Sequence, residues 1–165
     1  MSGTGRPEEH AVDAAGLRVG IVATRWNADV VEPMLARARE ALAHWGAEEP
    51  DVVHVAGAVE LPVVAQQFAR TRDAVVALGA VIRGGTPHFD YVCQSLTQGL
   101  TEVALAESTP VANGVLTCDT QEQARDRAGL PGSREDKGWE AATAAVDTAA
   151  VLRGLRTAGG ERVAG

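Results

Sequence analysis

Apolar residues along this chain fall into two kinds of segment that alternate from one end to the other. Continuous apolar runs are typical of strands that are buried on both faces. These runs cover residues 17–24, 52–56, 74–82 and 110–117. Apolar residues spaced three or four positions apart indicate amphipathic helices. Segments with that spacing cover residues 30–45, 60–70, 89–107 and 137–156.

A short fifth helix is predicted before the last long one. Asp119 followed by Glu122 has the spacing of a capping box, which satisfies free amide groups at a helix start. We expect this helix to run to Ala128, and residues 129–136 then form a polar turn.

Four successive strand–helix pairs predict an α/β fold, with a four-stranded parallel sheet and helices on both of its faces. In such a sheet the ligand crevice lies beyond the carboxyl ends of the strands. Unusual residues follow three of the predicted strands: Trp26 after the first, Glu60 after the second and residues 84–88 after the third. This coincidence predicts a binding site at that edge of the sheet.

The clearest chemistry follows the third strand, in the run Arg83-Gly84-Gly85-Thr86-Pro87-His88. The two glycines permit close approach of a ligand, Thr86 is a favourable N-cap, and Pro87 suits the first helical position. Free amide groups at such a helix start favour an anion, above all a phosphate. His88 falls in the first turn, where the helix dipole favours a neutral, proton-accepting imidazole. The sequence therefore predicts a phosphate site with a catalytic histidine.

Other candidate residues also have ordinary structural interpretations. Trp26 is suited to stacking on a planar ring, and equally to capping the core from a loop. Glu60 at a helix start is favoured by the helix dipole alone. Arg127 taken alone is more typical of a solvated charge. Lys137 begins a helix, which is unfavourable for a cation unless an anion lies nearby, and this mismatch hints at a function.

Length and charge limit the class of protein. The 165 residues fit one domain over 17–158, preceded by a flexible arm over 1–16 and followed by a tail over 159–165. A net charge of −7 without a basic block argues against nucleic acid and against an anionic membrane as partners. The arm lacks the apolar segment of a signal peptide, and no run is long enough to span a membrane.

The two cysteines indicate the compartment. Cys93 and Cys118 lie in apolar runs without metal-ligand spacing, which favours buried free thiols over a disulfide. Free thiols are typical of a reducing environment, so we expect a cytoplasmic protein.

Several motifs occur in a fixed order along the chain. They are Thr24-Arg25-Trp26-Asn27, Gly57-Ala58-Val59-Glu60-Leu61-Pro62, residues 79–91, Asn113-Gly114-Val115-Leu116-Thr117 and residues 122–129. Together these motifs resemble those of the lumazine synthase family, over about residues 17–156. The resemblance implies a flavodoxin-like three-layer sandwich.

The resemblance also implies a reaction. Members of the family condense 5-amino-6-(D-ribitylamino)uracil with 3,4-dihydroxy-2-butanone 4-phosphate to 6,7-dimethyl-8-ribityllumazine, releasing phosphate and water. They do so in riboflavin biosynthesis, without a metal or an organic cofactor. Carried over to this sequence, His88 is the catalytic residue and moves protons during imine formation, phosphate elimination and ring closure.

Binding roles for the pyrimidine substrate are implied in the same way. Trp26 stacks on the ring, and Ala58, Val59 and Glu60 hold the ribityl chain, with Glu60 accepting hydrogen bonds from its hydroxyls. Backbone groups that meet the edge of the uracil come from Ala80, Val81 and Ile82.

For the phosphorylated substrate, the resemblance assigns the phosphate to Gly85 and Thr86. Asn113 and Arg127 come from a neighbouring subunit, where Arg127 completes the phosphate clamp, and Lys137 is a further substrate-binding residue. The active sites therefore lie at the interfaces of a homo-oligomer. The turn between Arg127 and Lys137 is slightly longer than in members that build icosahedral shells, so we expect a pentamer, with a closed shell as the alternative.

Two other functions compete with the synthase. A non-catalytic relative that binds a lumazine or a flavin has no need of His88, so the set Trp26, Glu60, His88 and Arg127 disfavours it. A flavodoxin-like nucleotide-binding domain is the third interpretation, and the glycine turn alone is compatible with it.

Overall fold

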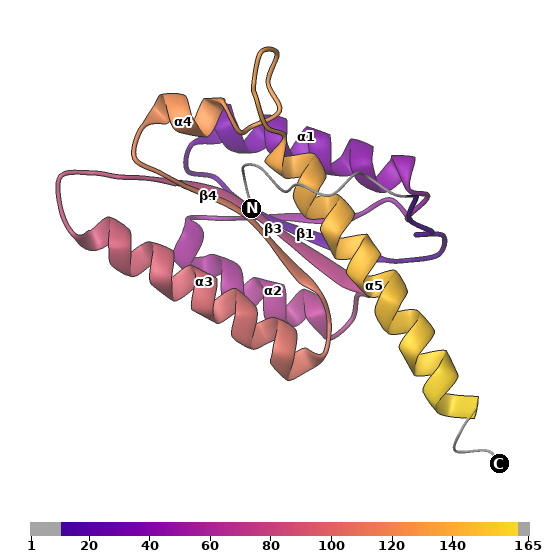
Figure 1. Ribbon diagram of the computed structural model, residues 1–165. Helices are drawn as coiled ribbons and strands as arrows, with labels where there is room; N and C mark the ends of the chain where they lie inside the picture. Colours follow the sequence, from indigo (N-terminus) through magenta and orange to yellow (C-terminus); the bar gives the residue numbers. More distant parts are fainter. Residues whose placement is uncertain (1–10, 162–165) are drawn as a thin grey trace.

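Four parallel strands form one sheet at the centre of the structure (Figure 1). The computed structural model describes residues 11–161. The strands are β1 (Val19–Thr24), β2 (Asp51–Val55), β3 (Ala74–Ile82) and β4 (Val111–Cys118). Their order is β2-β1-β3-β4, and all three neighbouring pairs run parallel. The predicted α/β fold with a four-stranded parallel sheet is confirmed.

Helices cover both faces of the sheet and complete a three-layer sandwich (Figure 1). The pair α1 (Ala28–His44) and α5 (Lys137–Glu161) packs on one face. The pair α2 (Leu61–Ala69) and α3 (His88–Glu107) packs on the other. Successive residues of a strand point to opposite faces, so Ile21 joins the first apolar cluster and Val22 the second.

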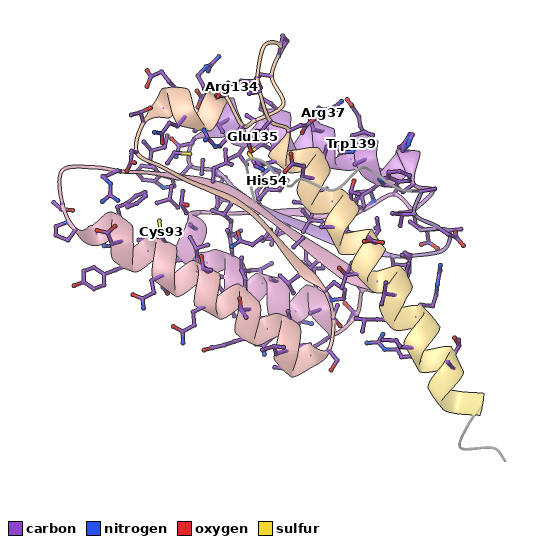
Figure 2. The ribbon with its side chains drawn as sticks, viewed as in Figure 1. Arg37, His54, Cys93, Arg134, Glu135 and Trp139 are labelled. Atoms are coloured by element: carbon purple, nitrogen blue, oxygen red, sulfur yellow. The ribbon has the colours of Figure 1, made fainter. Side chains whose placement is uncertain are left out.

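The contact between α1 and α5 depends on small side chains. The buried face of α5 is lined by Ala141, Ala142, Ala145 and Ala149. Near the start of α5, the Arg37 guanidinium lies 5.1 Å from the centre of the Trp139 ring, and its Nε lies 2.6 Å from Asp136 Oδ2 (Figure 2). Arg37 therefore joins α1 to the start of α5 through polar and ring contacts.

Both ends of the domain extend further than the sequence predicts. Residues 11–16, assigned to the flexible arm, pack on the domain: Val12 and Ala14 are buried, and the Ala14 amide donates to the Trp45 carbonyl at 3.2 Å. Their apolar side chains gain more from burial than from exposure to water. Residues 1–10 of the predicted arm lie outside the described residues. The helix α5 reaches Glu161, beyond the predicted end at residue 156, so residues 159–161 of the predicted tail are helical.

Two predicted helix caps are wrong. The short helix α4 (Gln121–Arg125) is capped by Thr120, whose Oγ1 accepts from the Gln123 amide at 3.2 Å, and not by Asp119. The side chain of Gln123 turns back and accepts from the Asp119 amide at 2.9 Å, so the reciprocal pair is shifted by one residue. At the start of α3, Pro87 occupies the N-cap position with helical backbone angles, and Thr86 lies outside the helix.

We predict that Gly138→Ala lowers the free energy of unfolding by about 1–3 kcal/mol, because a β-carbon at residue 138 would overlap the carbonyl oxygen of Met34 in α1. Urea denaturation measures the change. Gly154→Ala, in the same helix, is the matched control because a β-carbon there meets no atom within 4 Å. It should raise stability by about 0.5–1 kcal/mol. Equal effects of the two substitutions would contradict close packing of α5 on α1.

Candidate active site

The loops after β1 and β2 bring a tryptophan and a glutamate to the two sides of one glycine. A β-carbon on Gly57 would lie 3.7 Å from Trp26 Cδ1 and 3.4 Å from Glu60 Oε2. Glu60 accepts from the Gly57 amide at 2.9 Å, which orients its carboxylate. The Trp26 side chain is 71% exposed and that of Val59, in the 3-10 turn η1 (Ala58–Glu60), is 53% exposed. An indole and a fixed carboxylate therefore face solvent side by side.

The end of β3 is tied to the loop that carries Trp26. Asn27 Nδ2 donates to the Ala80 carbonyl at 2.8 Å, and Asn27 takes a left-handed conformation with φ of 56° at the start of α1. Ala80 is buried, whereas Val81 and Ile82 are half-buried. The last turn of β3 thus comes to the surface beside the Trp26 loop, with Ile82 as its final residue.

The turn from β3 into α3 is exposed. Gly84, Gly85, Thr86 and His88 are all accessible, and a β-carbon on either glycine would meet no atom within 4 Å. Packing within the chain therefore does not require glycine at these positions, which leaves the space in front of the turn open to a ligand. His88 is the first residue of α3, where the amide groups that open the helix have no partner within it.

A second group of predicted site residues lines a separate pocket of about 380 Å³ along the edge strand β4. Asn113 from β4, Arg127 from the segment after α4 and Lys137 from the start of α5 all line it. Asn113 is exposed, and its Oδ1 accepts from the Val115 amide at 3.0 Å. The structure therefore brings these three residues together.

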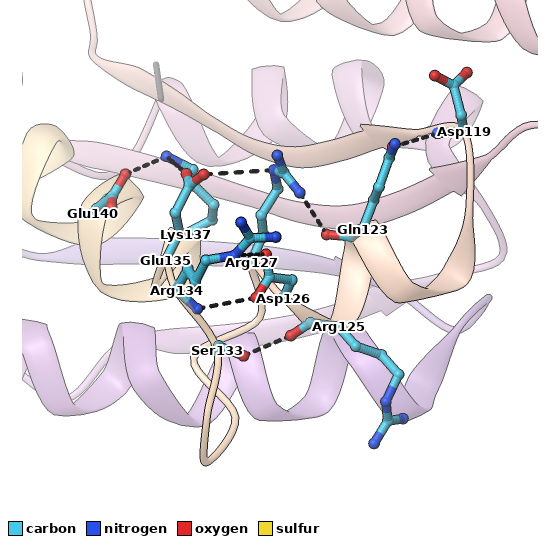
Figure 3. Close-up of polar contacts among 10 residues, drawn as sticks. All are labelled: Asp119, Gln123, Arg125, Asp126, Arg127, Ser133, Arg134, Glu135, Lys137 and Glu140. Carbon is cyan, nitrogen blue, oxygen red and sulfur yellow. Dashed lines mark hydrogen bonds and ion pairs between the residues drawn. The ribbon is translucent and has the colours of Figure 1, made fainter. Parts of the chain in front are cut away.

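The charged side chains of this pocket form a chain of ion pairs (Figure 3). Lys137 Nζ lies 2.6 Å from Glu140 Oε2 and 2.6 Å from Glu135 Oε2, an oxygen that is itself buried. Glu135 Oε1 lies 3.7 Å from Arg127 Nε, and Arg127 Nη1 donates to the Gln123 carbonyl at 2.9 Å. Two cations are matched by two carboxylates, so the cluster is balanced and its side chains are held in place.

Lys137 is a fixed positive charge in this cluster. Burial lowers its pKa, but hydrogen bonds with Glu135 and Glu140 outweigh burial, and the pKa is raised above that of an ordinary lysine. A lysine that stays protonated at neutral pH binds anions and does not act as a base. A lysine at the start of a helix needs a nearby anion, and Glu135 and Glu140 of the same chain supply it.

The two groups of predicted site residues therefore lie on different surfaces of the chain. Trp26, Glu60 and His88 follow the carboxyl ends of three strands, whereas the pocket with Arg127 and Lys137 runs along β4 and α5. None of the first group lines the 380 Å³ pocket, a statement that covers the described residues. Within residues 11–161, no group of three or more His, Cys, Asp or Glu side chains is arranged to hold a metal ion.

Both cysteines of the sequence are free thiols. Cys118 is buried at the end of β4, as predicted, whereas Cys93 in α3 is only half-buried. Burial is the main cause that raises the pKa of each thiol. Neither is therefore poised to act as a nucleophile.

Comparison with known proteins decides the family. Residues 16–153 match the family model of 6,7-dimethyl-8-ribityllumazine synthase, which is most of the chain. The chain belongs to this family. It is therefore an enzyme of the transferase type, and the predicted role in riboflavin biosynthesis is confirmed.

Close relatives carry the same name. The 6,7-dimethyl-8-ribityllumazine synthase of Thermobifida fusca is 73% identical over 162 residues, which cover 98% of this chain and 95% of the relative. That of Saccharopolyspora erythraea is 61% identical over 156 residues, 94% of each chain. That of Mycobacterium leprae is 59% identical over 155 residues, 94% of this chain and 97% of the relative.

Sequence reasoning missed two residues that organise the site. The sequence assigns no role to Asn27, yet its side chain links the start of α1 to β3 through the Ala80 carbonyl. Its signal is an asparagine between a predicted strand and a predicted helix, because asparagine tolerates the left-handed conformation better than most residues. Glu135, between Arg127 and Lys137, was treated as part of a polar turn. A signal is available there too, because Glu135 stands two residues before Lys137, the only lysine in the sequence.

Proposed function

We propose that this chain forms 6,7-dimethyl-8-ribityllumazine at a composite site. One subunit contributes the strand ends with Trp26, Glu60 and His88, and the next subunit contributes the pocket along β4 with Arg127 and Lys137. The substrates are 5-amino-6-(D-ribitylamino)uracil and 3,4-dihydroxy-2-butanone 4-phosphate. The observation that carries this division is that the two groups lie on different surfaces of one chain.

The pyrimidine half of the reaction is assigned to the loops after β1 and β2. The exposed Trp26 indole stacks on the uracil ring. The Glu60 carboxylate, oriented by the Gly57 amide, accepts hydrogen bonds from the ribityl hydroxyls beside Ala58 and Val59. Backbone groups at the end of β3 meet the uracil edge, at Ala80, Val81 and Ile82.

The phosphate half is assigned to the turn after β3. Gly85 and Thr86 present backbone and hydroxyl groups in front of the start of α3, where the helix dipole favours an anion. Arg127 and Lys137 of the neighbouring subunit add positive charge, and Asn113 lies beside them. The ion pairs with Glu135 hold both cations before substrate binds, which lowers the cost of ordering them.

His88 transfers protons between the two halves. The amine of the pyrimidine attacks the ketone carbonyl, and water leaves as the imine forms. Loss of phosphate needs a further proton transfer, and so does closure of the ring, in which the second amine attacks the remaining carbonyl and a second water leaves. An exposed imidazole next to the phosphate turn is within reach of these positions. Holding both substrates in one orientation supplies much of the remaining acceleration, without a covalent intermediate with the protein.

We predict that His88→Ala lowers kcat on the order of 10²-fold while leaving the affinity for the pyrimidine almost unchanged, because the imidazole acts in proton transfer. The assay mixes both substrates with purified protein and follows the lumazine by absorbance and fluorescence, against the spontaneous rate. Large loss of pyrimidine affinity in the variant would contradict this role. No acceleration by the unsubstituted protein, together with tight binding of a lumazine or flavin, would favour the non-catalytic relative.

We predict that Arg127→Ala raises the KM for the phosphorylated substrate about tenfold or more, and that for the pyrimidine far less, since a charge-assisted contact to phosphate is lost. Steady-state kinetics with each substrate varied in turn separate the two effects. Arg125→Ala is the matched control: Arg125 is exposed, pairs with Asp29 at 3.3 Å and does not line the pocket. Equal increases in both constants would show that Arg127 is structural.

We propose a homopentamer as the assembly, and the free thiols Cys93 and Cys118 support a cytoplasmic location. Large apolar side chains exposed on the single chain support association, and they include Trp26, Val59, Val63, Tyr91, Leu105 and Leu155. No helix within the described residues is long and apolar enough to cross a membrane.

Light scattering on the purified protein tests the assembly. We expect a particle of about 86 kDa, from five chains of 17.1 kDa each. A particle of about a megadalton would show a closed shell instead, and a 17 kDa species would remove the basis of the composite site.

A further inference from the structure

Arg83 has no part in the mechanism above, yet it lies directly between the last residue of β3 and the glycine turn. We propose that Arg83 is a positioning residue, which holds the turn 84–87 and His88 in the geometry that the reaction needs. The proposal rests on the proposed function for its kinetic consequences. Its structural part, the restraint of the turn, stands on the contacts of Arg83 alone.

The first set of contacts reaches the start of α3. Arg83 Nη2 lies 3.2 Å from Asp90 Oδ1, and Nη1 lies 3.4 Å from Asp90 Oδ2, so guanidinium and carboxylate meet at two points. The guanidinium carbon also lies 4.1 Å from the centre of the Phe89 ring, within cation–π range. Phe89 and Asp90 directly follow His88, so Arg83 contacts the first turn of α3 through two neighbouring side chains.

The second set of contacts reaches the segment after β4. Arg83 Nε lies 2.7 Å from Asp119 Oδ1, and the Arg83 amide donates to the Cys118 carbonyl at 2.9 Å. The Asp119 amide in turn donates to Gln123 Oε1 (Figure 3). Gln123 also accepts from Arg127 through its carbonyl. One arginine therefore connects the His88 turn to the short helix that precedes Arg127.

Among residues 11–161, the turn has few other contacts that restrain it. Residues 83–88 are exposed, both glycines face open space, and the N-cap residue Pro87 makes no side-chain capping bond. Two adjacent glycines sample many backbone conformations, and fixing them has an entropic cost. Misplacing a catalytic group by about 1 Å is enough to lower a rate on the order of 10²-fold. The side-chain contacts of Arg83 with Phe89, Asp90 and Asp119, here called the clamp, join both ends of the turn and reduce this freedom.

The charge of Arg83 is already committed to its own chain. Hydrogen bonds with Asp119, and then with Asp90, raise the pKa of Arg83. Two carboxylates surround one guanidinium, so the local balance is one negative charge. Arg83 therefore acts on the substrate phosphate through the shape of the turn and not as an additional cation.

The test compares four variants. Arg83→Ala removes all side-chain contacts of Arg83. Arg83→Lys keeps the positive charge but not the planar guanidinium. Asp119→Ala removes one of its two carboxylate partners. Arg72→Ala is the matched control: Arg72 lies 2.7 Å from Asp51 Oδ2 and 5.9 Å from the centre of the Phe68 ring, at the opposite edge of the sheet. Three readouts are taken: amide hydrogen exchange over residues 84–90, the KM for each substrate with kcat, and the thermal midpoint.

We expect Arg83→Ala to speed exchange over residues 84–90 and to raise the KM for the phosphorylated substrate about tenfold, with a lower kcat and little change for the pyrimidine. Asp119→Ala should show part of this effect. Arg83→Lys should show more than half of it, because lysine keeps the charge but cannot make the same contacts. Arg72→Ala should change neither the exchange over residues 84–90 nor the kinetic constants. The thermal midpoints of Arg83→Ala and Arg72→Ala should agree.

Three results would overturn the proposal. They are unchanged exchange and kinetics in Arg83→Ala, the same changes in Arg72→Ala, or tighter binding of the phosphorylated substrate in Asp119→Ala, which would mean that charge alone matters. Failure of the proposed function is distinguishable, because the unsubstituted protein would then not accelerate lumazine formation. In that case exchange over residues 84–90 decides alone: faster exchange in Arg83→Ala but not in Arg72→Ala supports the clamp, and equal exchange refutes it.

Discussion

Every residue of β1 is buried, and β3 beside it is buried over residues 74–80. The backbone groups of a strand in this position have no water to bond with and must pair with strands on both sides. Parallel pairing in turn requires a helical crossover over each strand, which places helices on both faces. The rest of the structure depends on this burial, since it aligns the strands and brings their carboxyl ends to one edge. Trp26, Glu60 and the turn before His88 each follow the carboxyl end of one of these strands as a consequence.

The cations of the candidate site are restrained by carboxylates of the same chain. Lys137 is held by Glu135 and Glu140, and Arg83 by Asp90 and Asp119. Exposed ion pairs such as those of Arg83 contribute little to stability on their own. Their contribution is geometric, because long flexible side chains lose their freedom before a substrate arrives. The ion pairs around Lys137 restrain their side chains in the same way, and they are less exposed to solvent than those of Arg83.

The predicted site residues are divided between two surfaces of the chain, and in the proposed assembly each surface is a partial site. The edge strand β4 has its pocket lined by Asn113, Arg127 and Lys137, while the strand ends carry the proposed catalytic histidine. In the proposed ring each subunit contributes to two active sites, one on either side. The contacts from Arg83 through Asp119 and Gln123 to Arg127 connect these two parts within a single chain. Assembly and activity are therefore expected to depend on the same surfaces.

The sequence by itself determined the order of strands and helices, the parallel sheet and the family, because these follow from apolar periodicity and contiguous motifs. Only the tertiary structure decided the caps at Thr120 and Pro87, the packing of Val12 and the pairing of Lys137 with Glu135. The position of a cap depends on backbone angles, and the sequence pattern does not distinguish one cap residue from its direct neighbour. The other contacts join residues that periodicity does not relate. Such side chains meet only after the sheet has fixed their positions in space.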